Sequence, residues 1–425
     1  MASPSLWLYR VLLAGLVPAA IPVLALGQLL TGKRRPRFRD RLARGLPPLV
    51  PGGAWIQAVS VGEVELARRL VGELERRAPE LPLLLTATTA TGLALAARTL
   101  GKRLPVQPCP LDLPGPVRRV LAAAAPRLLV LVETELWPEM LHQAAQRGVP
   151  AVVVNARLSA RSHAAYRRAG ALLAPLLEPL SLVLARSAAD AERFSDLGVP
   201  RERIVVTGNL KYDLEPDERP LEWAPTVTRA AAGRPILVAG STMEGEEALL
   251  LDALAALDAD GRRPFLVLAP RHPERFAAAA ELVAARGLRC ARRSRPEELA
   301  AGADVFLIDG IGELARAYRL ARAAFVGGSL APTGGHNPLE PAVWGVPVLS
   351  GPHVHNFREV YDEMVGAGGA RLVADAAELA VAATLWLEDP GLAAAAGAAG
   401  REVVERNRGA TARTVDALLG LLGKG

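Results

Sequence analysis

Short apolar runs alternate with segments of helical periodicity along the first half of the chain. Small or polar residues follow each run, and a helical pattern follows them. The runs that have the length and composition of buried strands are Trp55–Val59, Leu83–Thr86, Leu128–Val132 and Ala151–Val154. Strands that alternate with helices in this way predict a parallel, doubly wound α/β sheet.

The alternation begins again after a segment without any sustained period. Residues 213–235 are rich in Pro, Asp, Glu and Arg, and we interpret them as a linker. The strands expected after it are Ile236–Ala239, Phe265–Leu268, Val305–Ile308, Ala324–Val326 and Val346–Leu349. The sequence thus predicts two Rossmann-like domains, 33–212 and 236–395, that face a central cleft at the carboxyl ends of their strands. Residues 396–425 are predicted to form a helical segment.

A long apolar run lies near the amino terminus. It extends from Val11 to Leu30 with one strongly polar side chain in it. Twenty residues at the helical rise would span about 30 Å, the thickness of the hydrocarbon core of a bilayer. We therefore predict an N-terminal membrane-anchor helix, residues 1–32. Pro18 and Pro22 would kink or shorten a helix, so a spanning and a shallow monotopic anchor both stay open.

Basic residues crowd the segment directly after this run, and only Arg10 precedes it. They are Lys33, Arg34, Arg35, Arg37, Arg39, Arg41 and Arg44. By the positive-inside rule, the chain after residue 32 is expected at the cytoplasmic face of a bacterial inner membrane, in contact with membrane lipids. The alternative is a signal peptide cleaved at Ala25-Leu26-Gly27, but the positive charge just after the run opposes translocation.

Composition narrows the class of partner. The chain has 425 residues, enough for two domains, and a net charge of +6, which favours anionic ligands. Basic stripes with interleaved aromatic residues and zinc-finger spacings are both missing from the sequence, so we do not expect a nucleic-acid partner. The two cysteines, Cys109 and Cys290, form no disulfide framework, which suits a reducing compartment.

Polar and glycine-rich segments follow the expected strands of the second half. Gly240, Ser241 and Thr242 close the first of these strands, where a turn and a helix start offer N–H groups and hydroxyls to a phosphate. A simple helix cap explains this motif equally well. Pro270 and Arg271 end the next strand, and a guanidinium there is suited to phosphate or carboxylate.

The segment 327–340 contains two pairs of glycines, which permit close approach of a ligand to the backbone. Asn337 and Glu340 are three residues apart and therefore share one helical face, where a carboxylate suits the hydroxyls of a ribose. A glycine loop with a capped helix is the alternative. The chain has no Walker motif, and its six histidines show no spacing typical of metal ligands, so we expect no metal and no cofactor.

Polar residues also follow the strands of the first half. These residues are Ser60, Glu63, Glu133 and Arg157. Each could contact an acceptor or a sugar, and the two carboxylates could also serve as an acid or base. Each acidic residue could instead cap the helix that follows it.

Ten motifs in order resemble those of the lipid A 3-deoxy-D-manno-octulosonic acid (Kdo) transferases, over nearly the full chain. They are AVSVGEV (58–64), TATTATG (86–92), ETELWP (133–138), NARLS (155–159), TGNLKYD (207–213), GSTMEGEE (240–247), PRHPERF (270–276), FVGGSL (325–330), GGHNPLEP (334–341) and GPHVHNF (351–357). The resemblance implies a fold of the glycosyltransferase B type. It also implies a CMP-Kdo donor, a lipid A precursor as acceptor, and inverting transfer without a metal.

The resemblance also implies roles for single residues. In the family, an acidic residue in a segment after the anchor looks like the general base. The segment Phe38–Ala43 resembles that segment, and Asp40 is its acidic residue. A surface carboxylate paired with its neighbouring arginines is the alternative for Asp40. Arg271 would hold the phosphate, and Asn337 and Glu340 the ribose or phosphate. The residues implied to line the rest of the donor site are Gly240, Ser241, Thr242 and Pro270, together with Ile311, Gly312 and Glu313 beside the cytosine.

The sequence departs from the family pattern at four places. Asp40 replaces a glutamate, Gln57 and Met243 each replace a histidine, and Cys109-Pro110-Leu111-Asp112 stands where the family has a YLPYD-like segment. Two other functions stay open. One is a transferase or epimerase of the same fold that uses a UDP-sugar. The other is a membrane-anchored protein that binds the nucleotide without catalysis.

Overall fold

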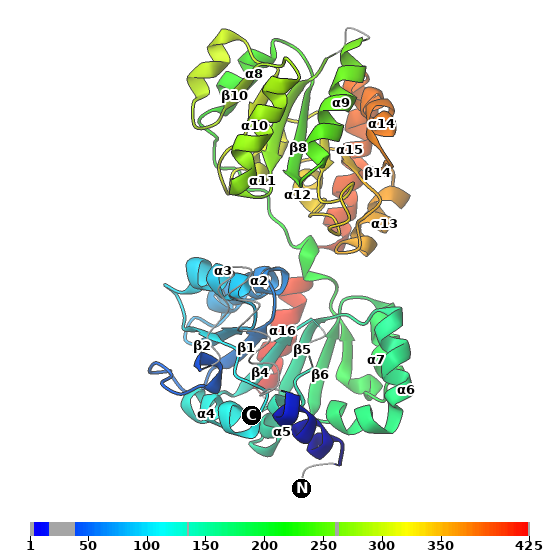
Figure 1. Ribbon diagram of the computed structural model, residues 1–425. Coiled ribbons are helices and arrows are strands. Elements are labelled where there is room, and N and C mark those ends of the chain that lie inside the picture. The colour runs from blue at the N-terminus through cyan, green and yellow to red at the C-terminus, as the bar shows by residue number, and fades with distance from the viewer. Residues whose placement is uncertain (1–3, 17–38, 134–135, 260–262, 424–425) are drawn as a thin grey trace. The chain divides into compact units, whose positions relative to one another are not determined.

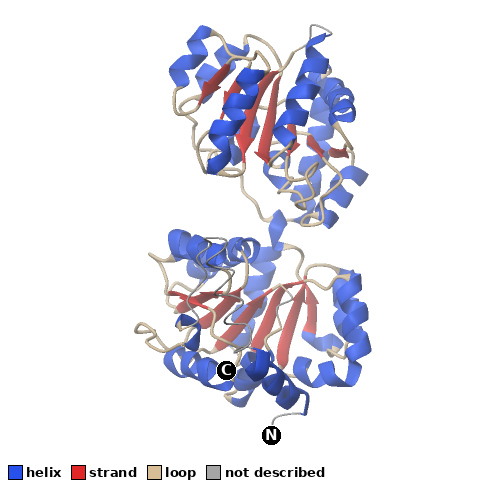
Figure 2. Cartoon of the chain, viewed as in Figure 1, coloured by secondary structure: helices blue, strands red, loops and turns tan. Residues whose placement is uncertain are grey.

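The computed structural model describes residues 4–16, 39–133, 136–259 and 263–423, which form two compact units. Unit 1 contains Met1–Asp213 and Arg408–Gly425, and unit 2 contains Leu214–Asn407. Each unit has a parallel sheet with helices packed on both of its faces (Figure 1, Figure 2). The two α/β domains predicted from the alternating pattern are therefore present.

In its described part, unit 1 has a seven-stranded sheet with the order β3-β2-β1-β4-β5-β6-β7 and parallel pairing throughout. The strands are β1 (Ala54–Ala58), β2 (Leu83–Ala87), β3 (Val106–Pro108), β4 (Leu128–Val132), β5 (Ala151–Ala156), β6 (Leu180–Ala185) and β7 (Ile204–Val206). The helices are α2 (Val61–Arg77), α3 (Ala90–Leu100), α4 (Pro114–Ala124), α5 (Pro138–Gln146), α6 (Ala160–Leu177), α7 (Ala188–Asp196) and α16 (Ala410–Leu422). The 3-10 turns are η1 (Asp40–Leu42), η2 (Arg201–Arg203) and η3 (Leu210–Tyr212).

The strand β1 shows how this unit is held together. All five of its residues are buried, as expected for a central strand covered on both faces. Ile56 faces the side of the sheet covered by α2, α3 and α16, where it joins a cluster with Leu70 and Val415. Trp55 faces the opposite side and joins a cluster with Val117 of α4 and Leu141 of α5.

The described part of unit 2 has a second seven-stranded parallel sheet with the order β10-β11-β9-β8-β12-β13-β14. Its strands are β8 (Ile236–Thr242), β9 (Phe265–Pro270), β10 (Cys290–Arg292), β11 (Val305–Leu307), β12 (Ala323–Val326), β13 (Val348–Ser350) and β14 (Ala370–Leu372). Its helices are α8 (Ala224–Ala231), α9 (Glu246–Ala259), α10 (Phe276–Ala285), α11 (Leu314–Ala317), α12 (Leu339–Ala342), α13 (Arg358–Gly366), α14 (Ala376–Glu388) and α15 (Pro390–Asn407). The 3-10 turns are η4 (Pro273–Arg275), η5 (Pro296–Ala301) and η6 (Tyr318–Leu320).

The segment expected to be a linker is instead part of unit 2. Unit 2 begins at Leu214, and residues 224–231 form α8. Leu221 and Trp223 are buried in the core of this unit, and the rings of Trp223 and Phe306 lie 4.9 Å apart between centroids. A few large apolar side chains are enough to fix this segment, although it has no sustained hydrophobic period.

The C-terminal residues do not form a segment of their own. The left-handed residue Gly409 (φ 88°) separates α15, which belongs to unit 2, from α16, which belongs to unit 1. Asp213 accepts hydrogen bonds from the backbone N–H groups of Gly409 and Thr411 and so fixes this crossing. The chain therefore returns to its first unit at its end.

Most of the predicted membrane anchor, 1–32, lies outside the described residues. Residues 4–16 are described and form a helix that packs on unit 1. Within the described ranges, no helix combines the length and the apolar character that a bilayer span requires. The hydroxyl of Tyr9 donates to Asp112 (2.8 Å), and Arg10 forms a bidentate ion pair with the buried Glu139 (2.6 and 2.9 Å).

Candidate functional site

The predicted polar residues of unit 1 lie at the carboxyl edge of its sheet. Because every strand pair in this sheet is parallel, the residues that follow β1, β4 and β5 meet at one edge. The turn η1 joins the same edge, since Arg41 Nε donates to the carbonyl of Cys109 just after β3, and Leu111 N donates to the carbonyl of Arg41. The chain therefore brings η1, with Asp40, to the edge that carries Ser60, Glu133 and Arg157.

Asp40 is exposed on η1, and its carboxylate has no hydrogen-bond or ion-pair partner among the described residues. The neighbouring Arg41 is occupied with the carbonyl of Cys109, and Arg119 donates to the carbonyl of Leu42 (2.7 Å). These contacts fix the turn and leave the Asp40 carboxylate open to solvent. An open carboxylate on a fixed turn is suited to accept a proton from a ligand.

Glu63 has a structural role in this arrangement. Its carboxylate accepts hydrogen bonds from the N–H of Val59 (2.6 Å) and the hydroxyl of Ser60 (3.2 Å), and it is buried at the start of α2. It therefore caps the helix, which was the alternative for this residue. Ser60 lies at the N-cap position and is half-buried.

Glu133 and Arg157 remain available at the same edge. Glu133 directly follows β4 and has φ 61°, a left-handed conformation that is costly for a residue with a side chain and is found often at functional sites. Arg157 follows β5, is half-buried, and has no side-chain partner in the described part of the chain. An unpaired guanidinium at a strand end is suited to an anionic group.

The donor residues predicted in unit 2 also lie at one carboxyl edge. They follow β8, β9, β11 and β12, and short contacts join these loops. Arg271 N donates to the carbonyl of Thr242 (2.9 Å), and Gly327 N donates to the carbonyl of Gly240 (2.9 Å). The residues that follow β9 and β12 are therefore bonded to the end of β8, between them in the sheet.

The three residues of the β8 turn differ in what they offer a ligand. Gly240 faces Tyr318 and Leu314, so packing inside the unit requires its missing side chain. Thr242 is fully buried, and its hydroxyl donates to Glu247 (3.1 Å). Ser241 is half-buried with φ 55°, so its hydroxyl is the one of this turn that stays accessible.

A buried carboxylate that the sequence analysis did not single out holds the loop after β12. Glu246 is 1% exposed and accepts four hydrogen bonds from consecutive N–H groups of this loop. The donors are Gly328 (2.7 Å), Ser329 (2.8 Å), Leu330 (2.8 Å) and Ala331 (3.1 Å). A fifth comes from the N–H of Met243 (2.9 Å). These N–H groups are therefore occupied by the protein and are not free for a ligand.

Arg271, Asn337 and Glu340 belong to the segments that follow β9 and β12. The guanidinium of Arg271 is exposed and has no partner among the described residues. Asn337 accepts a hydrogen bond from Leu339 N (3.1 Å) and so begins α12, whose first turn contains Glu340. Pro270 is buried at the end of β9 and turns the chain toward Arg271.

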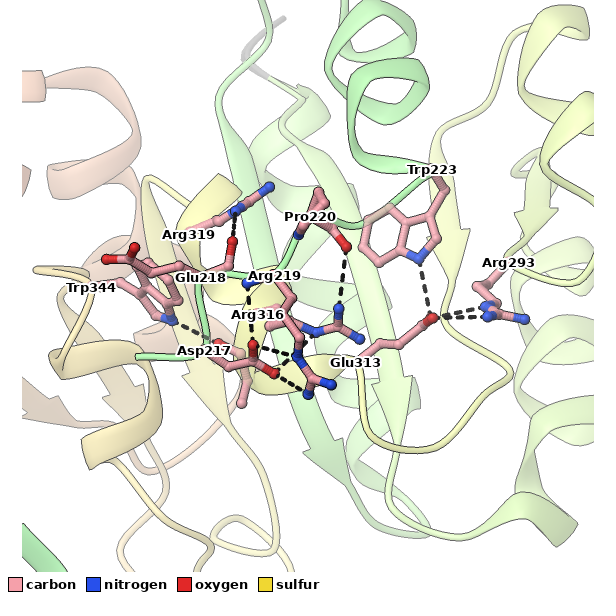
Figure 3. A network of polar contacts seen from close by, with 11 residues as sticks. Asp217, Glu218, Arg219, Pro220, Trp223, Arg293, Glu313, Arg316, Arg319 and Trp344 are labelled. Carbon is pink, nitrogen blue, oxygen red and sulfur yellow. Dashed lines mark hydrogen bonds and ion pairs between the residues drawn. The ribbon is translucent and has the colours of Figure 1, made fainter. Parts of the chain in front are cut away.

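Glu313 belongs to a polar network beside a cavity of about 450 Å³ (Figure 3). Arg293 donates to both carboxylate oxygens of Glu313 (2.8 Å each), and Trp223 Nε1 donates to one of them (3.1 Å). Hydrogen bonding from Arg293 lowers the pKa of Glu313. Its carboxylate is thus already paired, whereas the N–H groups of Ile311 and Gly312 have no partner among the described residues.

His336 is a second feature that the sequence analysis passed over. It lies next to Asn337, and its buried Nε2 has no hydrogen-bond partner among the described residues. The only signal in the sequence was its place between paired glycines and Asn337. The described residues contain no cluster of three or more His, Cys, Asp or Glu side chains arranged to hold a metal ion.

Known proteins of one description are similar to this chain over most of its length. The family model described as 3-deoxy-D-manno-octulosonic-acid transferase (kdotransferase) matches residues 33–214. A 3-deoxy-D-manno-octulosonic acid transferase of Haemophilus influenzae is 39% identical over 397 residues, which cover 91% of this chain and 92% of the relative. The enzyme of the same description from Bordetella pertussis is 40% identical over 400 residues, which cover 91% of each chain.

Solved structures of low sequence identity share the fold. A glycosyltransferase from Rickettsia africae has a TM-score of 0.58 at 12% identity, with 88% of this chain and all of the other covered. A UDP-GlcNAc 2-epimerase from Neisseria meningitidis has a TM-score of 0.57 at 13% identity, with 87% and 100% covered. Likeness at this level shows the architecture of two parallel α/β sheets and nothing about the ligand.

Proposed function

The chain belongs to the 3-deoxy-D-manno-octulosonic acid (Kdo) transferase family, and from this premise we propose that it transfers Kdo from CMP-Kdo to a lipid A precursor. The reaction is a step of lipopolysaccharide core biosynthesis. The observation that carries the proposal is the identity of 39–40% over nine-tenths of the chain, which spans the loops of both sheet edges.

The open side chains of unit 2 support a CMP-sugar as the donor. The unpaired guanidinium of Arg271 binds the phosphate, with the hydroxyl of Ser241 beside it. Asn337 and Glu340 contact the ribose or the phosphate. Cytosine, a planar base with donors and acceptors on one edge, pairs with the free backbone N–H groups of Ile311 and Gly312.

The open carboxylate of Asp40 is the general base of the proposed reaction. It takes the proton from a hydroxyl of the acceptor, whose oxygen forms a bond to the anomeric carbon of Kdo. The bond between that carbon and the phosphate oxygen breaks on the opposite face, so the configuration inverts, and its electron pair leaves with CMP. General base catalysis of this kind contributes about 10²–10⁴-fold.

We also propose that the chain acts at the cytoplasmic face of the inner membrane. On the described helix 4–16, five apolar side chains stand exposed, although Tyr9 and Arg10 tie the same helix to unit 1. The five are Trp7, Leu8, Val11, Leu12 and Leu16. An exposed apolar face followed by an apolar run and seven basic residues is typical of a segment at a lipid surface.

The test is transfer from CMP-Kdo, generated in situ, to a tetraacylated lipid A precursor in detergent, with mass spectrometry to count the sugars added. A product heavier by one or more Kdo residues is expected. If no product forms and CMP still binds, the chain is a nucleotide-binding protein without this transfer activity. If UDP binds in preference to CMP, the donor is a UDP-sugar and the proposal is wrong.

A further inference from the structure

The imidazole of His336 packs against the glycine turn after β12. His336 N donates to the carbonyl of Gly327 (3.1 Å), and Gly335 N donates to the carbonyl of Gly328 (2.6 Å). A Cβ atom on Gly328 would lie 2.7 Å from Cδ2 and 2.9 Å from Nε2 of the imidazole. Gly328 also has φ 69°, so glycine is needed here for both its conformation and the space that it leaves to the ring.

One nitrogen of this ring has no hydrogen-bond partner among the described residues. Nε2 of His336 is buried and makes no hydrogen bond within the described ranges. A buried polar atom without a partner destabilises the folded state, and a ligand that supplies the missing partner explains it. Burial, followed by the charges of Arg271 and His272, lowers the pKa of His336 to about 4. The imidazole is therefore neutral near pH 7 and carries one ring hydrogen.

The surroundings of Nε2 point to an anion. Arg271 comes from the loop after β9 and His336 from the loop after β12, two neighbours of β8 in the sheet. The guanidinium of Arg271 is unpaired, and its charge acts on His336. His272 lies on the same side, and His355 borders the turn at Gly334. The two charged groups that shift the pKa of His336, Arg271 and His272, both lower it, which indicates positive charge on this side of the ring.

We propose that Nε2 of His336 donates a hydrogen bond to the phosphate oxygen that departs from the sugar, an inference that rests on the proposed function. When the bond from the anomeric carbon to this oxygen breaks, its electron pair and the growing negative charge remain on the oxygen. The hydrogen bond becomes stronger as that charge grows, which stabilises the transition state. No proton moves from His336, because CMP leaves as its anion and the acceptor proton goes to Asp40.

Transfer kinetics provide the first test. His336→Phe keeps a ring of similar size and removes the nitrogen, and we expect kcat to fall by about 10²–10³-fold, the usual effect of losing one such donor. His336→Gln retains an N–H donor on a flexible side chain and should recover part of the loss. His353→Phe, the same change at an exposed histidine of the neighbouring loop, is the matched control and should keep kcat.

Binding of CMP and of cytidine provides the second test, which does not depend on transfer. Free CMP carries the charge that the departing phosphate acquires. His336→Phe should therefore lower the affinity for CMP by about tenfold and leave the affinity for cytidine unchanged. Calorimetry on the full chain measures both ligands. This pattern in a protein that transfers no Kdo would support the phosphate contact while rejecting the proposed function.

Two results would overturn the inference. One is a folded His336→Phe variant that transfers Kdo at the rate of the wild type. The other is an equal loss of affinity for CMP and for cytidine, which would mean that His336 supports the loop without contacting the phosphate. The unfolding transition of each variant shows whether a loss has a structural origin.

Discussion

The carboxylate of Glu246 accepts a hydrogen bond of 2.8 Å from the backbone N–H of Ser329, a residue 83 positions further along the chain. Glu246 is the first residue of α9, which follows β8, and Ser329 belongs to the loop after β12. This contact therefore joins two segments at the carboxyl edge of the sheet of unit 2. The neighbouring N–H groups of Gly328, Leu330 and Ala331 donate to the same side chain. One buried anion thus determines the shape of the loop that carries His336 and Asn337.

Replacing Glu246 by Gln should destabilise unit 2 and weaken CMP binding. The amide of Gln has one acceptor oxygen, so at least one of the buried N–H donors faces an NH₂ group and loses its partner. We expect the free energy of unfolding to fall by about 2–4 kcal/mol. Glu244→Gln, in the same motif but with a largely exposed side chain, is the matched control. Urea unfolding measures the stability of the two variants, and calorimetry measures their affinity for CMP. Equal stability of the two variants would contradict this account.

Replacing Asp40 by Asn should abolish most of the transfer and leave the nucleotide in place. The amide cannot take the proton of the acceptor, so kcat should fall by about 10²–10⁴-fold, while the affinity for CMP stays unchanged. Asp40→Glu keeps a carboxylate and should retain activity. Glu80→Gln removes an exposed carboxylate elsewhere in unit 1 and controls for the loss of charge. Full activity of Asp40→Asn would remove Asp40 from the mechanism.

The exposed face of helix 4–16 should lie in lipid when the protein is on a membrane. A fluorophore attached to Leu12→Cys should be quenched by lipids that carry a quencher on their acyl chains, because Leu12 is 54% exposed on this face. The same label on Glu65→Cys, a position of α2 whose side chain is 40% exposed, should not be quenched. Vesicles of phosphatidylethanolamine and phosphatidylglycerol are suitable, and equal quenching at the two sites would argue against this orientation.

The sheets were predictable where strands are long and apolar. Leu128–Val132 was predicted with the bounds that β4 has, and β1, β2 and β5 differ from expectation by one or two residues at their ends. The strands β3, β10 and β14 were not predicted, because each has three residues and includes a polar one, such as Gln107 or Arg292. Such strands are set by their neighbours in the sheet rather than by their own pattern. The apolar strands β6 and β7 were also missed, although their sequences, LSLVLA and IVV, carry a usable signal.

The candidate site was predictable only in part. The resemblance pointed to Asp40 and Arg271, which have open side chains, but spacing alone did not reveal that Glu63 and Thr242 are bonded inside the protein. Glu246 had looked like one of several acids at a helix start. Four of its five partners lie more than 80 residues away, so its role follows from tertiary structure that no local pattern contains.

A buried acid in unit 1 should make the stability of the protein depend on pH. Burial raises the pKa of Asp112 from 3.8 to about 6, against the hydrogen bonds that it accepts from Tyr9 and from the N–H groups of Glu139 and Met140. The folded protein therefore binds this proton more tightly than the unfolded chain does. The contribution of Asp112 to the free energy of unfolding is fully present below pH 3.8 and is lost as the pH rises to about 6.

The loss should be about 3 kcal/mol between pH 4 and pH 7, since each unit of pKa corresponds to about 1.4 kcal/mol. Other carboxylates titrate in the same range, so the measurement is the difference between the wild type and Asp112→Asn in urea unfolding at several pH values. The variant lacks the titrating group, and its stability relative to the wild type should therefore improve as the pH rises. A difference that stays constant from pH 4 to pH 7 would show that Asp112 is ionised throughout, and that the N–H groups at the start of α5 compensate its burial.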